Sequence, residues 1–344
     1  MKKSYYLFNP GRLSRKDHTL KFTPVDAEGR ALKPRYLPIE GVKNLYVFGS
    51  LDANSAMYNL LGRSHIPVHF FDHYEHYTGS FMPREFLLAG KMQVAQTQHY
   101  LTGRKRLAIA RSLIIGAAHN MRKNLSYYQH RGKDLADILA CFDQHQAELL
   151  ALVPPEGRKV DLVPALMGLE GNLRQTYYRA FDRIMEGSGF TFGTRSRQPP
   201  QNELNALISF GNMLCYTACL DQIYHTQLNP TISFLHEPGA RRYSLALDLA
   251  EIFKPLLVDR LIFKLVNKRQ LQAKDFDASL EGCLLKEAGR KTFVQAWDER
   301  LKETIQHRHL GRKVSYGYFI RLECYKLAKH CLDIAAYQPF KAWW

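Results

Sequence analysis

The order of apolar and polar residues divides the chain into two parts. Up to about residue 82, short runs rich in Tyr, Phe and Val alternate with Gly, Pro and Asp, a pattern typical of β-strands. The runs expected to form strands are Tyr5–Phe8, Thr19–Thr23, Arg35–Ile39, Leu45–Gly49 and His65–Phe71. Between the last two, Asp52–Arg63 predicts one short helix with Asp52 or Ser50 as its cap.

After Pro83 the apolar residues recur with the helical period of about 3.6. Loops are expected at about 187–202 and 229–243, a break at Val153–Lys159, and a frayed tail at Lys341–Trp344. The stretches expected to be helical are Glu85–Leu101, Arg104–Tyr128, Asp134–Leu152, Asp161–Met185, Leu204–Thr226, the segment after Pro255, and Val314–Ala336. The predicted fold class is α+β, with a small N-terminal β-rich domain (1–86) and a larger all-α domain (87–344).

The net charge changes the functional picture. The 344 residues carry 48 Lys and Arg against 32 Asp and Glu, a formal charge of +16. Such an excess favours a polyanionic partner, either nucleic acid or an anionic membrane surface, over a plain basic protein. No apolar run approaches the roughly 18 residues that span a bilayer, so nucleic acid is preferred and no membrane partner is expected.

Cysteine usage and the N-terminus point to a cytoplasmic protein. None of the six cysteines forms a CxxC pair, so zinc-ribbon spacing is missing and a reducing compartment is indicated. No apolar core follows the two lysines near the N-terminus, so no signal peptide is expected.

The segment Thr231–Pro255 places charged residues inside an apolar run. A carboxylate surrounded by leucine, isoleucine and phenylalanine needs a cation, because burying an unpaired charge is costly. Asp248 and Glu251 would share one face of a helix, since positions three apart are neighbours. His236, just before a Pro-Gly turn, could fold back towards that face. We interpret this segment as half of a divalent-metal site.

Glu170 is a second acid in an apolar setting, on the hydrophobic stripe of Asp161–Met185. A lone Glu there is commonly the edge of an amphipathic face. The following Gly171 costs a helix interior about 1 kcal/mol relative to alanine, which suggests a close approach at that point. Arg174, one turn later, could pair with Glu170 or contact a phosphate.

Basic residues both inside and outside these segments are candidates for contact with a phosphate backbone. Loop 186–202 combines arginine with phenylalanine, glycine and proline, and reads equally well as a plain connector. Arg260, Lys264 and Lys268 are spaced by four residues, which gives one basic stripe that a solvated helix face would also explain. The predicted DNA-binding residues are Arg174, Arg195, Arg197, Arg241, Arg242, Arg260, Lys264 and Lys268.

One further cluster is open to two interpretations. The sequence HIPVHFFDHYEH, residues 65–76, gathers histidines and acids at a predicted strand end. A metal site is conceivable there, but solvated polar residues are the more common reason for such a patch.

Several stretches together resemble the CRISPR-associated adaptation integrase family, the first Cas protein ("Cas-one"). In chain order, they are IPVHFFD, LMGLEGNLRQTYY, FTFGTRSRQPPQNELNALISFG and TISFLHEPGARRYSLALDLAEIFKPLLVDRLIF. They follow the family's order through both domains. The departures are Ser233 where Gly is usual, Lys254 where Arg is usual, and Gln198 beside the prolines.

The resemblance implies a function and a set of site residues. It places Glu170, His236 and Glu251 on a catalytic metal, with Asp248 as a neighbouring accessory acid. Two carboxylates and an imidazole suit Mg²⁺ or Mn²⁺, and the histidine favours Mn²⁺. The implied activity is metal-dependent DNA endonuclease and integrase chemistry that inserts spacer DNA into the CRISPR repeat array. The implied partners are double-stranded DNA, a second copy in a homodimer whose contact is expected in the N-terminal domain, and the small second Cas protein.

Two other functions stay open at this point. One is a non-catalytic nucleic-acid-binding protein whose acids are structural. The other is a metal-dependent hydrolase of a small phosphorylated substrate, which the charge of +16 disfavours because a small substrate needs only a local basic patch.

Overall fold

The structure is a computed structural model in which the chain forms two compact units, Met1–Phe86 and Leu87–Trp344. It describes residues 2–344 except 73, 85, 86, 88, 153–161, 240–242, 280 and 281. The break expected at Val153–Lys159 and the predicted phosphate contacts Arg241 and Arg242 therefore lie outside the described residues.

The first unit is built from two four-stranded sheets. In one sheet β1, β5 and β7 are parallel and β8 is antiparallel to β7, in the order β1-β5-β7-β8. In the other sheet β4, β3 and β2 are antiparallel and β6 is parallel to β2, in the order β4-β3-β2-β6. The strands are β1 Lys3–Leu7, β2 Gly11–Lys16, β3 Thr19–Pro24, β4 Arg35–Pro38, β5 Val42–Val47, β6 Leu51–Asp52, β7 Val68–Phe71 and β8 Tyr77–Phe81.

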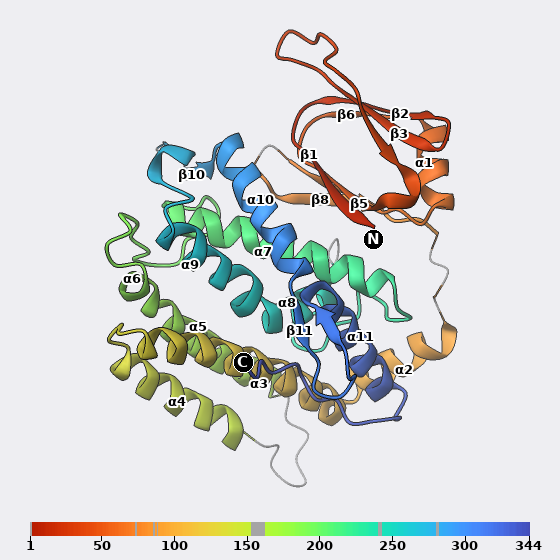
Figure 1. The fold of residues 1–344 in the computed structure, drawn as a ribbon. Coiled ribbons are helices and arrows are strands. Elements are labelled where there is room, and N and C mark those ends of the chain that lie inside the picture. Colours follow the sequence, from red (N-terminus) through yellow and green to blue (C-terminus); the bar gives the residue numbers. More distant parts are fainter. Residues whose placement is uncertain are drawn as a thin grey trace. The chain divides into compact units, whose positions relative to one another are not determined.

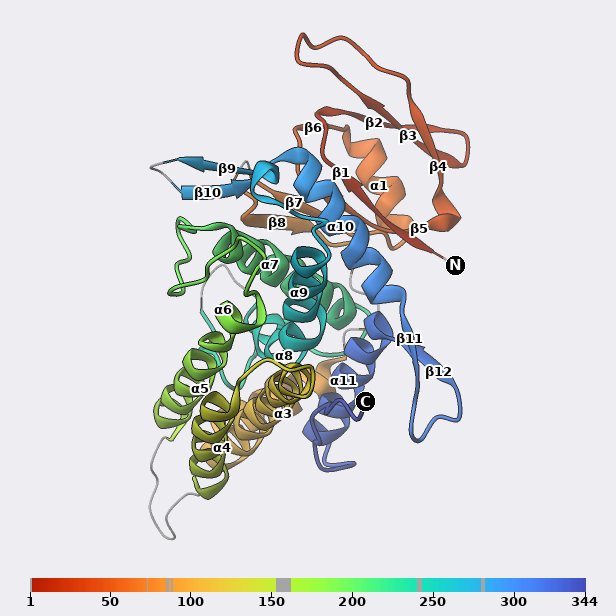
Figure 2. The same ribbon diagram turned by 60° about the vertical axis from the view of Figure 1, so that its left-hand side comes forward.

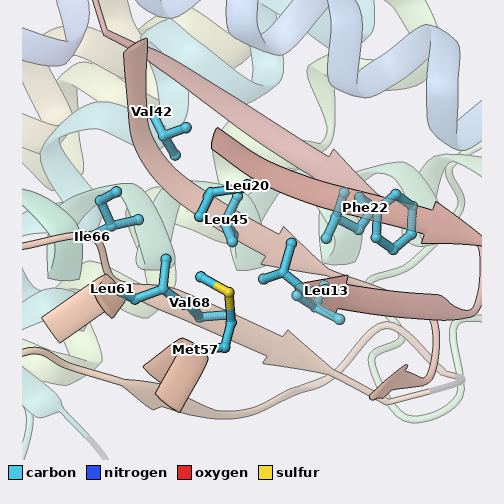
Figure 3. Close-up of a cluster of buried hydrophobic side chains, with 11 residues drawn as sticks. Leu13, Leu20, Phe22, Val42, Leu45, Met57, Leu61, Ile66 and Val68 are labelled. Atoms are coloured by element: carbon cyan, nitrogen blue, oxygen red, sulfur yellow. The ribbon is translucent and has the colours of Figure 1, made fainter. Parts of the chain in front are cut away.

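An apolar core joins these strands to helix α1, Ser55–Arg63. The core takes Leu13 from β2, Leu20 and Phe22 from β3, Val42 and Leu45 from β5, and Met57 and Leu61 from α1 (Figure 3). The helix begins later than predicted, because Asn54 rather than Asp52 or Ser50 is its cap. Its Oδ1 accepts the N–H of Met57 at 3.0 Å.

The second unit is mainly helical (Figure 1). Helix α7 is buried along most of its length, and α8 packs against both α7 and α3. Helices α3, α4 and α5 contact one another side by side. The helices are α2 Gly90–Leu101, α3 Gly103–His130, α4 Ala136–Ala151, α5 Val163–Tyr178, α6 Ala180–Ile184, α7 Glu203–Tyr224, α8 Ser244–Lys254, α9 Arg260–Asn267, α10 Glu287–Lys302 and α11 Tyr316–Cys331.

Two short hairpins correct the expectation that this unit is all-α. β9 (Phe276–Ser279) pairs with β10 (Gly282–Leu285), and β11 (Thr304–Gln306) pairs with β12 (Lys313–Ser315). Both hairpins are visible in Figure 2. Strands of three or four residues are too short for a period-2 pattern to stand out among charged residues. The α+β class, strand-rich then helical, is confirmed.

The C-terminal residues are packed rather than frayed. Ala342 is buried, and its N–H donates to Oδ1 of Asn120 at 2.9 Å. The Asn120 Nδ2 group donates in turn to the Ile252 carbonyl at 2.9 Å. Asn120 therefore ties the chain end to α3 and α8, and the expected frayed tail is wrong.

The histidine-rich stretch 65–76 is engaged in ordinary contacts where it is described. His69 is buried, with Nδ1 2.6 Å from the Ser80 hydroxyl, and His76 lies 3.5 Å from Asp72. Among the described residues, no group of three metal-ligating side chains forms there or elsewhere. A helix that combines the length and the apolarity needed to cross a membrane is likewise missing from the described residues.

Candidate metal centre

Helix α8 carries two of the predicted site residues, Asp248 and Glu251, and both are buried. Pro255 follows its last residue. Proline lacks an N–H and its ring displaces the carbonyl four residues earlier, so the regular α-ladder cannot continue. The chain passes instead through a π-helical turn, Pro255–Asp259, before α9 begins at Arg260. Such turns are frequent at functional sites.

Asp248 organises the segment that holds His236. Its carboxylate accepts the backbone N–H groups of Phe234 at 2.7 Å, Leu235 at 3.0 Å and His236 at 2.9 Å. It also accepts Nδ1–H of His236 at 2.8 Å. A fully buried carboxylate with four donors has little capacity for a metal, so Asp248 acts by positioning its neighbour.

Glu170 and Glu251 converge on one guanidinium. Arg174 Nε donates to Glu170 Oε1 at 2.7 Å across one turn of α5, and the same side chain bonds Glu251 Oε2 on α8. The other oxygen of Glu251 accepts from Lys254 Nζ at 2.6 Å. The side chains of Glu170, Arg174 and Glu251 are 16%, 12% and 8% exposed. Two acids 81 positions apart in the sequence thus reach the same cation.

The electrostatics follow from these contacts. Burial raises the pKa of Glu251, but the charges of Arg174 and Lys254 outweigh it and lower that pKa to about 2. Burial lowers the pKa of His236, yet Asp248 and Glu251 reverse this and the net direction is upward. Because His236 and Glu251 each shift the other's pKa, they lie within electrostatic range.

The types of ligand atom in this set suit a hard divalent ion. Glu170, Glu251 and His236 offer carboxylate oxygens and an imidazole nitrogen, and the two carboxylates already share one cation. Within the described ranges, however, no three His, Cys, Asp or Glu side chains are gathered closely enough to ligate one ion. Metal binding by Glu170, His236 and Glu251 therefore stays a prediction.

The predicted phosphate contacts lie in different settings. Arg197, Lys264 and Lys268 are exposed. Arg174 bonds Glu170 and Glu251. The guanidinium of Arg195 donates to two side chains of helix α7, Asn205 at 2.9 Å and Ser209 at 3.0 Å.

The basic stripe predicted on α9 is interrupted at its first member. Arg260 turns inward, with Nε 2.6 Å from Oδ1 of buried Asn124. Arg260 and Lys264 both belong to α9, but the Arg260 end of this face meets Asn124 of α3 instead of solvent.

Loop 186–202 is held by hydrogen bonds on two sides. The Asp182 carboxylate accepts the N–H groups of Phe192 at 2.5 Å and Gly193 at 3.2 Å. Buried Asn205 Nδ2 donates to the Thr194 carbonyl at 2.8 Å. These contacts make much of the loop a structured connector, with Arg197 its exposed basic residue.

Two residues that position the site, Arg106 and Gln96, carried no sequence signal, and a third, Lys254, did. Arg106 Nε on α3 donates to the Phe234 carbonyl at 3.0 Å, and Gln96 on α2 donates to the Ile232 carbonyl at 2.8 Å. Lys254 ends α8, three residues from Glu251. The three-residue spacing of Glu251 and Lys254 could be recognised in the sequence. The contacts of Arg106 and Gln96 could not, because each joins residues more than 125 positions apart.

Comparison with known proteins gives the family. A family model described as CRISPR associated protein Cas1 matches residues 5–299. The chain belongs to the Cas1 family. A relative named CRISPR-associated endonuclease Cas1 from Fusobacterium nucleatum is 45% identical over 344 residues, covering 100% of this chain and 98% of that protein.

Solved structures agree with the Cas1 assignment. A Cas1 protein from Thermotoga maritima matches with a TM-score of 0.82 and 37% identity, over 97% of this chain and 98% of that one. A casposase bound to an integration product has a TM-score of 0.81 over 98% and 93% of the two chains. At 19% identity the casposase shows that the Cas1 fold is shared.

Proposed function

We propose that this Cas1-family chain is a divalent-metal-dependent DNA endonuclease and integrase of CRISPR adaptation. The observation that carries the proposal is the convergence of Glu170 on α5 and Glu251 on α8. Both carboxylates bond the guanidinium of Arg174 inside a mostly buried site. Its relatives' name, CRISPR-associated endonuclease Cas1, supports the reaction class.

Each site residue has a distinct part in the proposal. Glu170, Glu251 and His236 would hold Mg²⁺ or Mn²⁺, and Asp248 keeps His236 Nδ1 protonated so that the lone pair of the neutral ring lies on Nε2. When bound, the ion polarises a phosphodiester and helps generate a hydroxyl nucleophile at neutral pH.

The proposed reaction exchanges one phosphodiester for another. The 3′-hydroxyl of a spacer fragment gives its proton to solvent water and attacks a phosphorus atom of the repeat, and the departing 3′-oxygen of the repeat takes up a proton from water. Because one P–O bond forms as one breaks, joining needs no external energy source. Water in place of the 3′-hydroxyl gives endonuclease cleavage.

The partners follow from the charge and from the family. The net charge of +16 suits double-stranded DNA, both the spacer precursor and the repeat. We further propose a homodimer that uses the N-terminal unit, assembly with the small second Cas protein, and a cytoplasmic location.

The test is metal-dependent cleavage and joining of duplex DNA by three variants, E170Q, E251Q and H236A. Each should lose at least about 100-fold in rate if it removes a metal ligand. E287Q, which alters an exposed pair on α10, is the control and should keep full activity. Undiminished Mn²⁺-dependent activity in all three folded variants would overturn the proposal.

A second function has one observation in its favour. Glu251 already has two cationic partners, Arg174 and Lys254, as a purely structural acid would. The second candidate is therefore a non-catalytic DNA-binding protein. Tight duplex binding that is unaffected by EDTA, with no cleavage or joining in Mn²⁺, would favour it.

A further inference from the structure

Arg174 occupies the place between the two acids proposed as metal ligands. Its Nε bonds Glu170 and its terminal nitrogen bonds Glu251, so one planar guanidinium links α5 to α8. A guanidinium stays protonated at any working pH and offers donors in fixed directions. Arg174 can therefore hold two carboxylates at a set spacing, as a metal ion would.

The charges at this point already balance. Glu170 and Glu251 contribute −2, and Arg174 and Lys254 contribute +2, so their sum is zero. The four side chains are at most 16% exposed. Adding a divalent ion while both bases stay in place would leave these four side chains and the ion with an excess of +2, which buried Asp248 beside His236 offsets only in part and which little water screens. At least one base must give up a carboxylate.

The geometry selects Arg174 for this release. Lys254 bonds one oxygen of Glu251 alone, three residues away on the same helix, and a carboxylate can keep that contact while its second oxygen binds elsewhere. Arg174 contacts both acids and bonds the oxygen of Glu251 that Lys254 leaves available. An ion shared by Glu170 and Glu251 needs the space that its guanidinium fills.

We propose that Arg174 is a positioning residue that holds Glu170 and Glu251 together before metal binding and competes with the divalent ion for them. The inference rests on the proposed metal site. Its consequence is a trade between two properties. Removing the guanidinium lowers the stability of the metal-free protein, because two buried carboxylates lose a partner, but strengthens metal binding.

The experiment measures Mn²⁺ binding and thermal unfolding on the full chain. R174M keeps an unbranched apolar side chain without the charge. R174K keeps the charge but loses the planar guanidinium that can donate to both acids. R179M is the matched control, since Arg179 at the end of α5 is 55% exposed and pairs with Asp137 at 3.9 Å. Mn²⁺ affinity is read by titration calorimetry, and unfolding temperature is read in EDTA and in Mn²⁺.

We expect R174M to unfold at a lower temperature in EDTA, to bind Mn²⁺ about tenfold more tightly, and to gain more thermal stability from Mn²⁺ than the unmodified protein. R174K should fall between the two in affinity, because an ammonium cannot bridge both acids in the same way. R179M should bind Mn²⁺ as the unmodified protein does.

Two failures are distinguishable. If the unmodified protein binds Mn²⁺ and folded R174M binds it equally or more weakly, the competition is wrong and the metal site stands. If neither binds Mn²⁺, the proposed function fails with it. Should R174M not fold, the Arg174 ¹⁵Nε–H signal of the unmodified protein, assigned with R174K, decides the question. It should shift on titration with Mg²⁺, and an unchanged signal at saturating Mg²⁺ overturns the inference.

Discussion

The Asp248 carboxylate accepts a hydrogen bond from Nδ1 of His236 at 2.8 Å, and this contact sets the chemistry of the ring. An ionised carboxylate only accepts, so Nδ1 carries the proton, and in the neutral imidazole Nε2 carries the lone pair. The same carboxylate closes the backbone turn at residues 234–236. Ring orientation and loop shape therefore depend on one buried acid.

The D248N substitution tests that dependence. An amide has one acceptor oxygen in place of two and turns two N–H donors towards the backbone donors, so several buried N–H groups lose their acceptor. We expect a loss of about 2–4 kcal/mol in the free energy of unfolding. We also expect a 10- to 100-fold weaker Mn²⁺ affinity, as for other residues that orient a ligand.

Urea unfolding and Mn²⁺ titration calorimetry measure the two effects. D143N is the control, because Asp143 lies in an exposed pair with Arg122. Equal Mn²⁺ affinity in folded D248N and unmodified protein would show that Asp248 does not prepare His236 for a metal.

Asp259, at the end of the π-turn, predicts an unusual pH dependence. Burial raises its pKa to about 7 from an ordinary value of 3.8, although Arg174 and the Tyr177 hydroxyl act against the shift. The folded protein then holds this proton more tightly than the unfolded chain does. The stability contribution is full below about pH 4 and is lost as the pH rises through 7.

The D259N variant should lack this slope. Between pH 4.5 and 7.5, the unmodified protein should lose about 3 kcal/mol of stability relative to D259N, because this window takes in a little over two pKa units of the shift at about 1.36 kcal/mol each. Urea unfolding in EDTA at four pH values measures the difference. The depressed pKa of Glu251 acts below pH 4.5 and does not interfere. Parallel pH profiles for the two proteins would show that Asp259 ionises normally.

Local relationships in the site were predictable from the sequence, and distant ones were not. Asp248 and Glu251 three apart, and Glu170 and Arg174 four apart, follow from helix geometry. Which partner each acid meets depends on how α5 and α8 pack, and that is set by contacts between residues far apart in the chain. The bond from Arg174 to Glu251 crosses 77 positions.

Strand prediction failed where the composition was atypical. β2, GRLSRK, is mostly polar, and β8, YTGSF, contains a glycine and few branched residues. Both are held in their sheets by backbone pairing with β3 and β7, which no single-sequence pattern reveals.

The close approach predicted at Gly171 was wrong, because a Cβ there would meet nothing within 4 Å.

The basic residues of α9 should separate into two classes. Lys264 and Lys268 are exposed, so K264A and K268A should each reduce the slope of log affinity against log salt by about 1. Arg260 bonds buried Asn124, so R260A should leave that slope unchanged and cost about 1–3 kcal/mol of stability. Duplex binding at several salt concentrations and urea unfolding distinguish them. A slope reduced by R260A alone would reverse the assignment.

Glycine permits a close approach between helix α7 and the π-turn at Gly211. A Cβ there would overlap Cγ1 of Val258 and come within 3.1 Å of Phe293 Cζ, whereas a Cβ at Gly168 on α5 would meet nothing within 4 Å. Val258 belongs to the π-turn that follows Glu251, so G211A presses directly on the segment leading out of the site.

We expect G211A to cost about 1–3 kcal/mol through overpacking. The matched variant G168A should gain about 0.5–1 kcal/mol, because alanine favours an exposed helix position. Urea unfolding of both gives the comparison. Since both replace a helical glycine with alanine, propensity alone predicts that each gains stability. A stabilised G211A would therefore mean that α7 and the π-turn are not in the close contact that holds the end of α8 in place.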